Sequence, residues 1–397
     1  MLSGLKIIEL ATYIAAPGAG GMLADWGANV IKIEAIDGDP IRRFFETLGA
    51  DNPGNPVFDL DNRGKKGIVL DITKPEGKAA ALKLIDTADV FLTNLRPGAL
   101  SRAGLDWPTL SAINPRLVFA SVTGYGLQGE DADKPGFDLA AFWAMSGVAA
   151  LTIPKGVEPF PIRTATGDHT CSLATVAAIL AAVVDRNNTG RGRLVETSLL
   201  RSGVYSVGSD MAIALRYGRV ASNRPRPDAV NPLNNFFKSS EGKWICLLPR
   251  QGSGDWPRIA RAAGRPELLE DARFTGAKLR RQNGPALVAE LDQGFNAMDF
   301  ATASRNLDKE DVVWSPILSA LDVIASPGAK AAGCFTEMSD GAGGVMLSPA
   351  APVRFPGEPE RVKGPAPAKG QHTEQVLLAA GYAQVEIDRL RHLGVIA

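Results

Sequence analysis

The stretch Lys6-Ile7-Ile8-Glu9-Leu10 opens the chain with residues that favour β-structure. Small residues follow in Ala15-Ala16-Pro17-Gly18-Ala19-Gly20-Gly21, then a helical pattern over 22–26, then the β-type run Asn29-Val30-Ile31-Lys32-Ile33-Glu34. This order predicts a strand, a glycine turn, a helix and a second strand. Such a unit is typical of a doubly wound α/β sheet.

The same alternation continues downstream of this unit. A helix is expected over 75–84, with a proline in its first turn. Further strands are expected at 67–71, 89–93, 117–122 and 194–197. Strands that alternate with helices predict a parallel sheet with crossover helices, so we expect an α/β fold.

The remaining sequence predicts three segments. Residues 138–184 read as mostly helical, and 172–184 are apolar nearly all round, which favours the interior. A turn at 187–192 and a long helix at 199–216 complete a first segment, 1–220. A proline-rich linker at 221–235 opens a smaller α+β module, 221–330, with a strand at 244–248. In the last segment, 331–397, an extended path at 337–370 leads to helices at 372–378 and 385–393.

Composition excludes several classes of protein. The 397 residues carry 43 Lys+Arg and 43 Asp+Glu, and this zero net charge argues against a nucleic-acid or membrane-surface partner. No run of about 18 apolar residues and no signal peptide is present, so we expect a cytoplasmic protein. Three cysteines without paired spacing and three histidines predict neither disulfides nor a metal site. They are Cys171, Cys246, Cys334, His169, His372 and His392.

The glycine-rich segment after the first strand has two interpretations. A dinucleotide site would place a pyrophosphate on the helix and a ribose on Glu34. The glycine spacing is not GxGxxG, however. The alternative is close packing of a glycine-rich helix on a sheet.

Asp168 lies in Thr166-Gly167-Asp168-His169-Thr170-Cys171, just before the apolar helix. An Asp at this place is commonly an N-cap. It is also suited to act as a nucleophile beside a glycine that lets a substrate approach. His169 as a base and Cys171 as a thiol nucleophile are further candidates. Residues two apart on a helix point in different directions, which disfavours a Cys–His pair.

Basic residues follow the strand expected at 89–93. Ligands of open α/β sheets bind at the carboxyl ends of the strands, so Arg96 and Arg102 are candidates for holding phosphate. Lys134 is a third candidate, and the alternative for all of them is a solvated surface.

Seven motifs in one order resemble the class III CoA-transferases, also called the carnitine dehydratase/bile-acid-inducible family. The resemblance runs from Met1 to the C-terminus, and two stretches, 58–66 and 167–169, look closest to the branch acting on 2-hydroxyacyl and aryl-lactate substrates. The motifs are GLKIIEL (4–10), GANVIKIE (27–34), NLRPG (94–98), TGYGLQG (123–129), PGFD (135–138), GD (167–168) and GQHTE (370–374).

The resemblance implies a Rossmann-like large domain built from both ends of the chain, a small domain, and a homodimer of interlocked rings. It places the nucleophile on Asp168 and CoA contacts on Asn94 and Arg102. No permanently bound cofactor is implied, because CoA and acyl-CoA are substrates, together with small carboxylic acids. Ala35 does not match a basic CoA contact of some members. Ile14 replaces a glutamine of the formyl/oxalyl branch, which indicates a more apolar pocket.

The implied reaction passes through an aspartyl anhydride and an aspartyl-CoA thioester. An ordinary Asp titrates near about 3.9, so Asp168 is expected to be ionised without a base. The segment Gln251-Gly252-Ser253-Gly254 is a candidate lid or an ordinary turn. Alternatives are a 2-methylacyl-CoA racemase, disfavoured because Phe137 stands where a histidine is needed, an NAD-dependent oxidoreductase, and a non-catalytic CoA-binding subunit.

Overall fold

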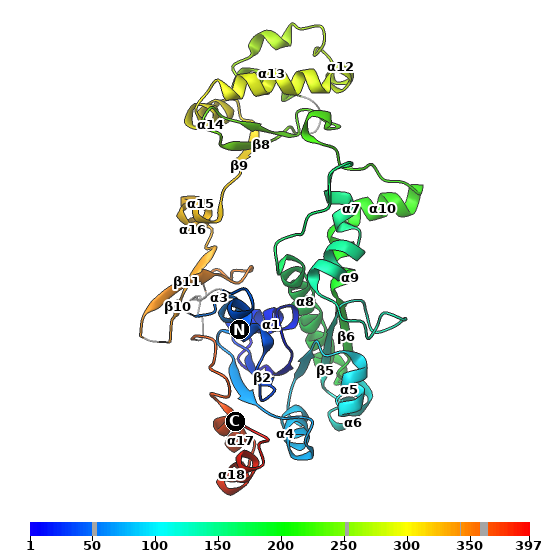
Figure 1. The fold of residues 1–397 in the computed structure, drawn as a ribbon, viewed down its shortest axis with the longest axis vertical. Coiled ribbons are helices and arrows are strands. Elements are labelled where there is room, and N and C mark those ends of the chain that lie inside the picture. The colour runs from blue at the N-terminus through cyan, green and yellow to red at the C-terminus, as the bar shows by residue number, and fades with distance from the viewer. Residues whose placement is uncertain (50–53, 251–253, 342, 358–363) are drawn as a thin grey trace. The chain divides into compact units, whose positions relative to one another are not determined.

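The computed structural model describes residues 1–49, 54–250, 254–341, 343–357 and 364–397. The chain forms two compact units (Figure 1). The larger unit comprises Met1–Ala149, Phe160–Arg216 and Gly328–Ala397, and the smaller comprises Ala150–Pro159 and Tyr217–Pro327. The large unit is therefore built from both ends of the chain. The domain bounds 1–220 and 221–330, with 331–397 completing the large domain, stay a prediction.

The larger unit is organised around one six-stranded parallel sheet in the order β3-β2-β1-β4-β5-β6, which confirms the α/β fold. This is the strand order of the Rossmann fold, in which the chain changes direction between its first and fourth strands. The strands are β1 (Lys6–Leu10), β2 (Asn29–Glu34), β3 (Lys66–Val69), β4 (Val90–Thr93), β5 (Val118–Thr123) and β6 (Leu194–Ser198).

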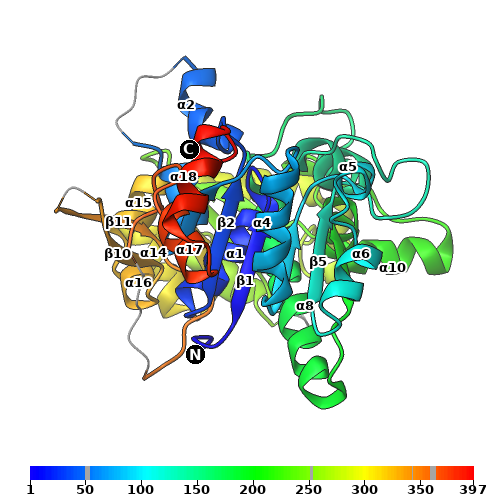
Figure 2. The same cartoon turned by 90° about the horizontal axis from the view of Figure 1, so that it is seen from below.

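One face of this sheet carries a large cluster of buried apolar residues. Ile8, Ile31 and Ile68 from adjacent strands are all buried there. The covering helices include the C-terminal pair, which Figure 2 shows beside α4 in front of the sheet. They are α4 (Pro75–Asp86), α5 (Pro97–Ala103), α6 (Trp107–Ile113), α17 (Thr373–Ala379) and α18 (Gln384–His392).

The last segment joins the sheet through side-chain and backbone bonds rather than through a strand. His372 N–H donates to the Gly67 carbonyl at 2.9 Å, and Thr373 Oγ1 accepts from Val69 N–H at 3.1 Å. The segment expected to be extended contains an antiparallel hairpin, β10 (Phe335–Ser339) with β11 (Val345–Pro349). The sequence analysis expected an extended path over 337–370 and did not predict this hairpin.

The glycine-rich segment is helical rather than a turn. Helix α1 (Ala15–Asp25) contains it, and α1 packs on α8 (Thr166–Thr189) and on α3 (Pro56–Asn62). A Cβ atom added at Gly18 would lie 2.7 Å from Ser172 Oγ, and one at Gly21 would lie 2.7 Å from the Asp61 carbonyl oxygen. The glycines thus permit close helix packing, as the second interpretation of the sequence held.

Helix α8 lies against α1, β5 and β6. It was expected to be buried on all sides, but some of its apolar residues are exposed. Leu173 and Val184 are 44% and 62% exposed. In the described part of the chain, α8 is the one helix long and apolar enough to cross a bilayer. Its contacts with the sheet and α1 account for its apolar composition.

Two further expectations about helices were wrong in detail. A turn was expected at 187–192, but helix α8 includes the first three of these residues. It ends at Thr189, before Gly190, which has a left-handed φ of 74°. The long helix expected at 199–216 is two helices, α9 (Leu199–Ser206) and α10 (Gly208–Tyr217). Between β5 and α8 lie the π-helix η2 (Asp138–Met145) and α7 (Val148–Thr152).

The smaller unit has the expected α+β composition. Its sheet is antiparallel and is formed by β7 (Asn235–Lys238), β8 (Trp244–Leu248) and β9 (Val313–Pro316). Phe237 and Phe295 stack in its core with ring centroids 5.2 Å apart. The main helices are α11 (Trp256–Ala262), α12 (Ala277–Gln282), α13 (Gly284–Asn296) and α14 (Phe300–Lys309).

Candidate active site

A cavity of about 240 Å³ opens where β1, β4, β5 and β6 of the larger unit end. Its place agrees with the rule that open α/β sheets bind ligands at the carboxyl ends of strands, where the strand order reverses. In the part of the chain that the structure describes, its lining includes two carboxylates and no lysine, arginine or histidine. The lining residues are Tyr13, Ile14, Ala15, Ile41, Phe44, Asn94, Val122, Thr123, Gly124, Gly136, Phe137, Asp138, Thr164, Asp168 and Leu199.

Asn94 lies where the strand order reverses, between β1 and β4. Its Oδ1 accepts from Thr12 N–H at 3.0 Å, and its Nδ2 donates to the Thr12 carbonyl at 2.6 Å. The two bonds join the end of β4 to the loop that follows β1. The amide therefore fixes the cavity wall, and its predicted contact with CoA stays a prediction.

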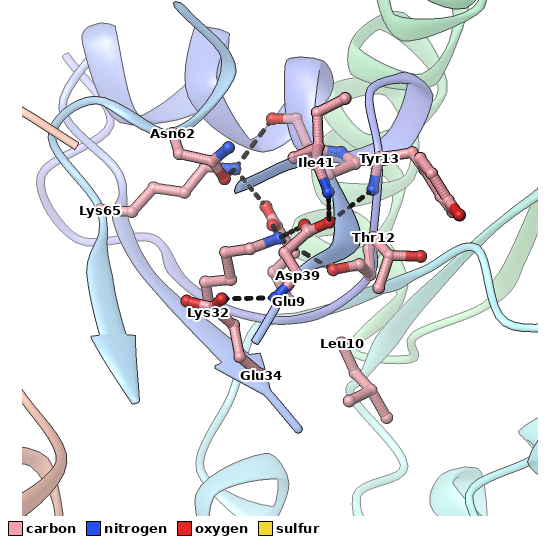
Figure 3. A network of polar contacts seen from close by, with 12 residues as sticks. Glu9, Leu10, Thr12, Tyr13, Lys32, Glu34, Asp39, Ile41, Asn62 and Lys65 are labelled. Atoms are coloured by element: carbon pink, nitrogen blue, oxygen red, sulfur yellow. Dashed lines mark hydrogen bonds and ion pairs between the residues drawn. The ribbon is translucent and has the colours of Figure 1, made fainter. Parts of the chain in front are cut away.

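Tyr13 follows in that loop with a left-handed φ of 63°. A non-glycine residue in this region is strained and needs support from its surroundings. The support comes from Asp39, whose Oδ1 accepts from Tyr13 N–H at 3.1 Å and from Ile41 N–H at 3.1 Å. Asp39 in turn pairs with the buried Lys32, whose Nζ lies 2.8 Å from Asp39 Oδ2 (Figure 3).

Glu9 extends this buried network to α3. It lies 3.2 Å from Lys32 Nζ through Oε1 and 2.7 Å from Lys65 Nζ through Oε2. Lys65 also donates to the Pro17 carbonyl at 2.9 Å and to Asn62 Oδ1 at 3.0 Å. Burial lowers the pKa of Lys65 to about 8 in spite of Glu9. The network ties β1, β2, α1 and α3 into one rigid support under the cavity.

Glu34 serves the same framework and is not free to bind a ribose. Arg42 donates to it through Nε and Nη2, both at 2.7 Å, and Asp39 N–H donates at 2.8 Å. Although burial opposes ionisation, Arg42 and this N–H hold the pKa of Glu34 below its usual range. The role of Glu34 is structural.

Two glycines bring the PGFD segment to the cavity. A Cβ at Gly124 would lie 3.0 Å from Gly136 Cα, so only glycine permits this approach. The next residue, Phe137, lines the cavity and meets Tyr13 edge-to-face at 5.3 Å. Phe137 carries no proton that it can exchange, as the sequence indicated.

Asp138 then begins η2, which packs on the first turns of α8. A Cβ at Gly167 would lie 2.5 Å from Cγ of Phe142 in η2. Gly167 therefore allows the two helices to approach, and does not face a substrate as we expected. This approach brings the carboxylates of Asp138 and Asp168 to the same wall of the cavity.

Asp168 is not the cap of α8. The N-cap position is Ala165, which has a left-handed φ of 72°, and α8 begins at Thr166. Burial raises the pKa of Asp168 to about 7, with Asp138 and Asp61 adding to the rise and His169 opposing it. The expectation of an ordinary value near 3.9 was wrong, because the site is largely desolvated and rich in carboxylates.

His169 is hydrogen-bonded to a buried carboxylate. Its Nε2 lies 3.1 Å from Oδ1 of Asp61, a buried residue of α3. This hydrogen bond, against the effect of partial burial, raises the pKa of His169 above its usual range. The side chain of Cys171 is fully buried, and burial raises the pKa of its thiol, so a thiol nucleophile has no support.

The basic residues predicted to hold phosphate lie outside the cavity lining. Arg96 Nη1 donates to the Asp133 carbonyl at 3.3 Å, and Lys134 Nζ lies 3.2 Å from Asp131 Oδ1. The structure thus brings Arg96 and Lys134 to the same loop, whereas Arg102 is exposed in the last turn of α5. Of the segment 251–254, residues 251–253 lie outside the described residues.

Sequence analysis predicted no role for Asp61 and Asp138. Both lie inside stretches that were quoted for the family resemblance, and that was their only signal. The approach of Asp61 and Asp138 to Asp168 depends on close helix packing at Gly18, Gly21 and Gly167. These glycines lie on other helices than Asp61 and Asp138, so the local sequence around the two carboxylates does not show the contacts. The unmatched Ala35 is exposed and Ile14 lines the cavity, in keeping with an apolar pocket.

Comparisons with known proteins identify the family of the chain. A family model described as CoA-transferase family III matches residues 2–373. The (R)-2-hydroxy-4-methylpentanoate CoA-transferase of Clostridioides difficile is 32% identical over 100% of this chain and 99% of its own length. The cinnamoyl-CoA:phenyllactate CoA-transferase of Clostridium sporogenes is 33% identical over 98% and 96%. The crystal structure of a CaiB/BaiF family protein from Brucella suis superposes with a TM-score of 0.84 at 28% identity, covering 96% of this chain and 99% of that one.

Proposed function

Because the chain belongs to CoA-transferase family III, we propose that it transfers CoA from an acyl-CoA thioester to a carboxylic acid with Asp168 as the nucleophile. The observation that carries this proposal is the Asp168 carboxylate, which lines a desolvated cavity at the point of strand reversal without serving as a helix cap. A carboxylate freed from a structural role in such a place is suited to covalent catalysis.

The reaction begins when an Asp168 carboxylate oxygen attacks the thioester carbonyl carbon. The C–S bond breaks, CoA thiolate leaves, and a mixed anhydride joins the acyl group to Asp168. The thiolate attacks the aspartyl carbonyl, which releases the donor acid and leaves an aspartyl-CoA thioester. The acceptor carboxylate then attacks the same carbonyl and expels the thiolate, and thiolate attack on the new acyl group regenerates Asp168. Covalent catalysis divides one exchange into easier steps.

The apolar lining supports an acid with an apolar side chain. Aromatic and aliphatic surface comes from Tyr13, Ile14, Phe44 and Phe137, and the described lining residues include no cation for a second carboxylate. Burial of a second, unpaired carboxylate is unfavourable. We therefore expect 2-hydroxy acids with branched or aromatic side chains to react better than dicarboxylic acids. The names of the two relatives above agree with this substrate class.

We assign CoA binding to Asn94 in the cavity wall and to three basic residues outside the cavity lining. Of these, Arg96 and Arg102 follow β4, and Lys134 lies in the loop that contacts α5. Arg102→Ala is expected to weaken CoA binding by about 1.5–3 kcal/mol, because phosphate–arginine contacts are charge-assisted. Calorimetry at two salt concentrations measures this, with Arg389→Ala on α18 as the control.

We also propose that the protein is a homodimer. Leu173 and Val184 on α8, and Tyr205 and Leu215 on α9 and α10, are large apolar side chains with exposed fractions between 44% and 88%. Helix α10 buries none of its residues within the chain. A second copy of the chain is the expected cover, as the family resemblance implies.

A transfer assay with the purified chain alone tests the proposed activity. Acyl-CoA donors are combined with a panel of 2-hydroxy, aryl-lactic and dicarboxylic acids, and new thioesters are identified by mass spectrometry. Transfer without a partner protein separates an enzyme from a CoA-binding subunit. Deuterium uptake at Cα of a 2-methylacyl-CoA, or binding of a nicotinamide followed by fluorescence, would support the racemase or the oxidoreductase instead.

A further inference from the structure

Three carboxylates and one imidazole meet beside the first turns of α8. Asp168 and His169 belong to α8, Asp138 to η2 and Asp61 to α3. The described cavity lining holds no lysine or arginine, so His169 is the nearest group on α8 able to carry a positive charge beside Asp168. The proposed reaction uses Asp168 and leaves Asp61 and His169 without a role.

Asp61 is held in one position. Its side chain is only 5% exposed, and a Cβ at Gly18 would lie 3.2 Å from its Oδ1. Its own backbone carbonyl abuts Gly21, where a Cβ would lie 2.7 Å away. Its Oδ1 lies 3.1 Å from His169 Nε2, within hydrogen-bonding distance. A buried carboxylate in this place fixes both the orientation and the protonation of the ring.

Among the described residues, the other elements against α8 supply no competing cation close to Asp168. The single titratable residue of α1, Asp25, pairs with Arg63 at 2.7 Å, and Glu196 of β6 accepts from Leu127 N–H at 2.7 Å. Strand β5 has no titratable side chain, and Arg201 of α9 is exposed. Lys65 follows α3, but its Nζ is committed to Glu9 at 2.7 Å.

We propose that Asp61 holds His169 as an imidazolium ion whose charge keeps the neighbouring Asp168 ionised for attack. Both are positioning residues, because neither touches the reacting atoms and no proton passes between His169 and the substrate. The inference rests on Asp168 being the nucleophile. It replaces the expectation that this carboxylate needs no help, since burial among Asp61 and Asp138 opposes its ionisation.

The chain holds three histidines, which makes the charge of His169 directly measurable. In full-length protein labelled with ¹³C at histidine Cε1, the His169 signal is assigned by its loss in His169→Gln. We expect its titration midpoint to lie above about 6.5 and to fall by about one pH unit or more in Asp61→Asn. Asp59→Asn, on the same helix, should leave it unchanged. An unmoved midpoint in Asp61→Asn, or a wild-type midpoint at or below about 6.5, would overturn the proposal.

Kinetics test the effect on Asp168. With 4-methylpentanoyl-CoA as donor and 2-hydroxy-4-methylpentanoate as acceptor, the acid limb of kcat/KM in His169→Gln should move up by about one pH unit. That is about a tenfold loss at pH 6 and little loss at pH 9. Asp61→Asn is not used here, because Asp61 also repels Asp168 and its removal has two opposing effects. His392→Gln on α18 is the matched control.

The outcomes separate this inference from the proposed function. A merely structural role of His169 would lower the rate equally at every pH, and that result overturns the inference. Near-wild-type transfer by Asp168→Asn would overturn the nucleophile, and the inference with it. An inactive Asp168→Asn together with an unshifted acid limb in His169→Gln would overturn the inference alone.

Discussion

Asp168 is a residue whose ionisation works against the folded state. Its pKa of about 7 in the fold exceeds the value of about 3.9 expected in the unfolded chain. The folded state therefore binds a proton more tightly than the unfolded state between these two values. It follows that the free energy of unfolding falls as the pH rises from about 4 to about 7 and stays lower above it.

Asp168→Asn is accordingly expected to stabilise the protein while it abolishes transfer. At pH 8 the variant should gain about 1–3 kcal/mol in the free energy of unfolding, because the amide carries no charge. At pH 4 the gain should vanish, since the wild-type carboxyl is protonated there in the fold. Denaturant unfolding at both pH values measures this difference. An equal gain at both pH values would show that the effect is not one of charge.

At the scale of elements, the approach of η2 to α8 forms the acidic wall. Gly167→Ala places a Cβ 2.7 and 2.5 Å from Cβ and Cγ of Phe142, which is too close unless one of the two helices shifts. We expect a loss of about 1–3 kcal/mol in unfolding free energy, because η2 must move. Transfer should fall as well, because Asp138 moves with η2.

Gly208→Ala is the matched control for stability in this experiment. Gly208 begins α10, and no atom lies within 4 Å of the position of its added Cβ. This variant should be as stable as the wild type or slightly more stable. If both variants unfold alike, close packing at Gly167 does not position η2.

The elements also show what the sequence predicts well and what it does not. The runs at 6–10 and 29–34 became β1 and β2 because β-favouring residues and parallel pairing agree there. The glycines of α1 suggested a turn because glycine disfavours helices locally, yet contact with Ser172 and Asp61 requires small residues. The hairpin of β10 and β11 buries Thr336, Met338 and Ser348, two of which are polar, so its sequence shows little hydrophobic alternation.

The candidate site, like the fold, was predicted from the sequence only in part. Asp168 was found through its motif, and the lack of the racemase histidine at Phe137 was read from the sequence. The convergence of Asp61, Asp138 and His169 on Asp168 was not, because it arises from three helices packed through glycines. The raised pKa of Asp168 follows from burial, which no local pattern reports.

At the scale of the whole molecule, the exposed apolar surface of α8, α9 and α10 predicts a dimer. Sedimentation should find a species of twice the chain mass. Leu215→Glu, at a position 88% exposed, should shift it towards the monomer, because a buried charge without a partner is unfavourable. Val385→Glu on α18, at a position 73% exposed, is the control and should leave the mass unchanged. A wild-type monomer with full activity would contradict the dimer.

The central claim is that Asp168 carries the acyl group and then CoA during turnover. The most direct measurement is to incubate the protein with an acyl-CoA and hydroxylamine and to read the modified peptide by mass spectrometry. We expect a hydroxamate on Asp168, its absence without acyl-CoA, and no transfer by a folded Asp168→Asn variant. A hydroxamate on another residue, or transfer by Asp168→Asn at near the wild-type rate, would contradict the role of Asp168 as nucleophile.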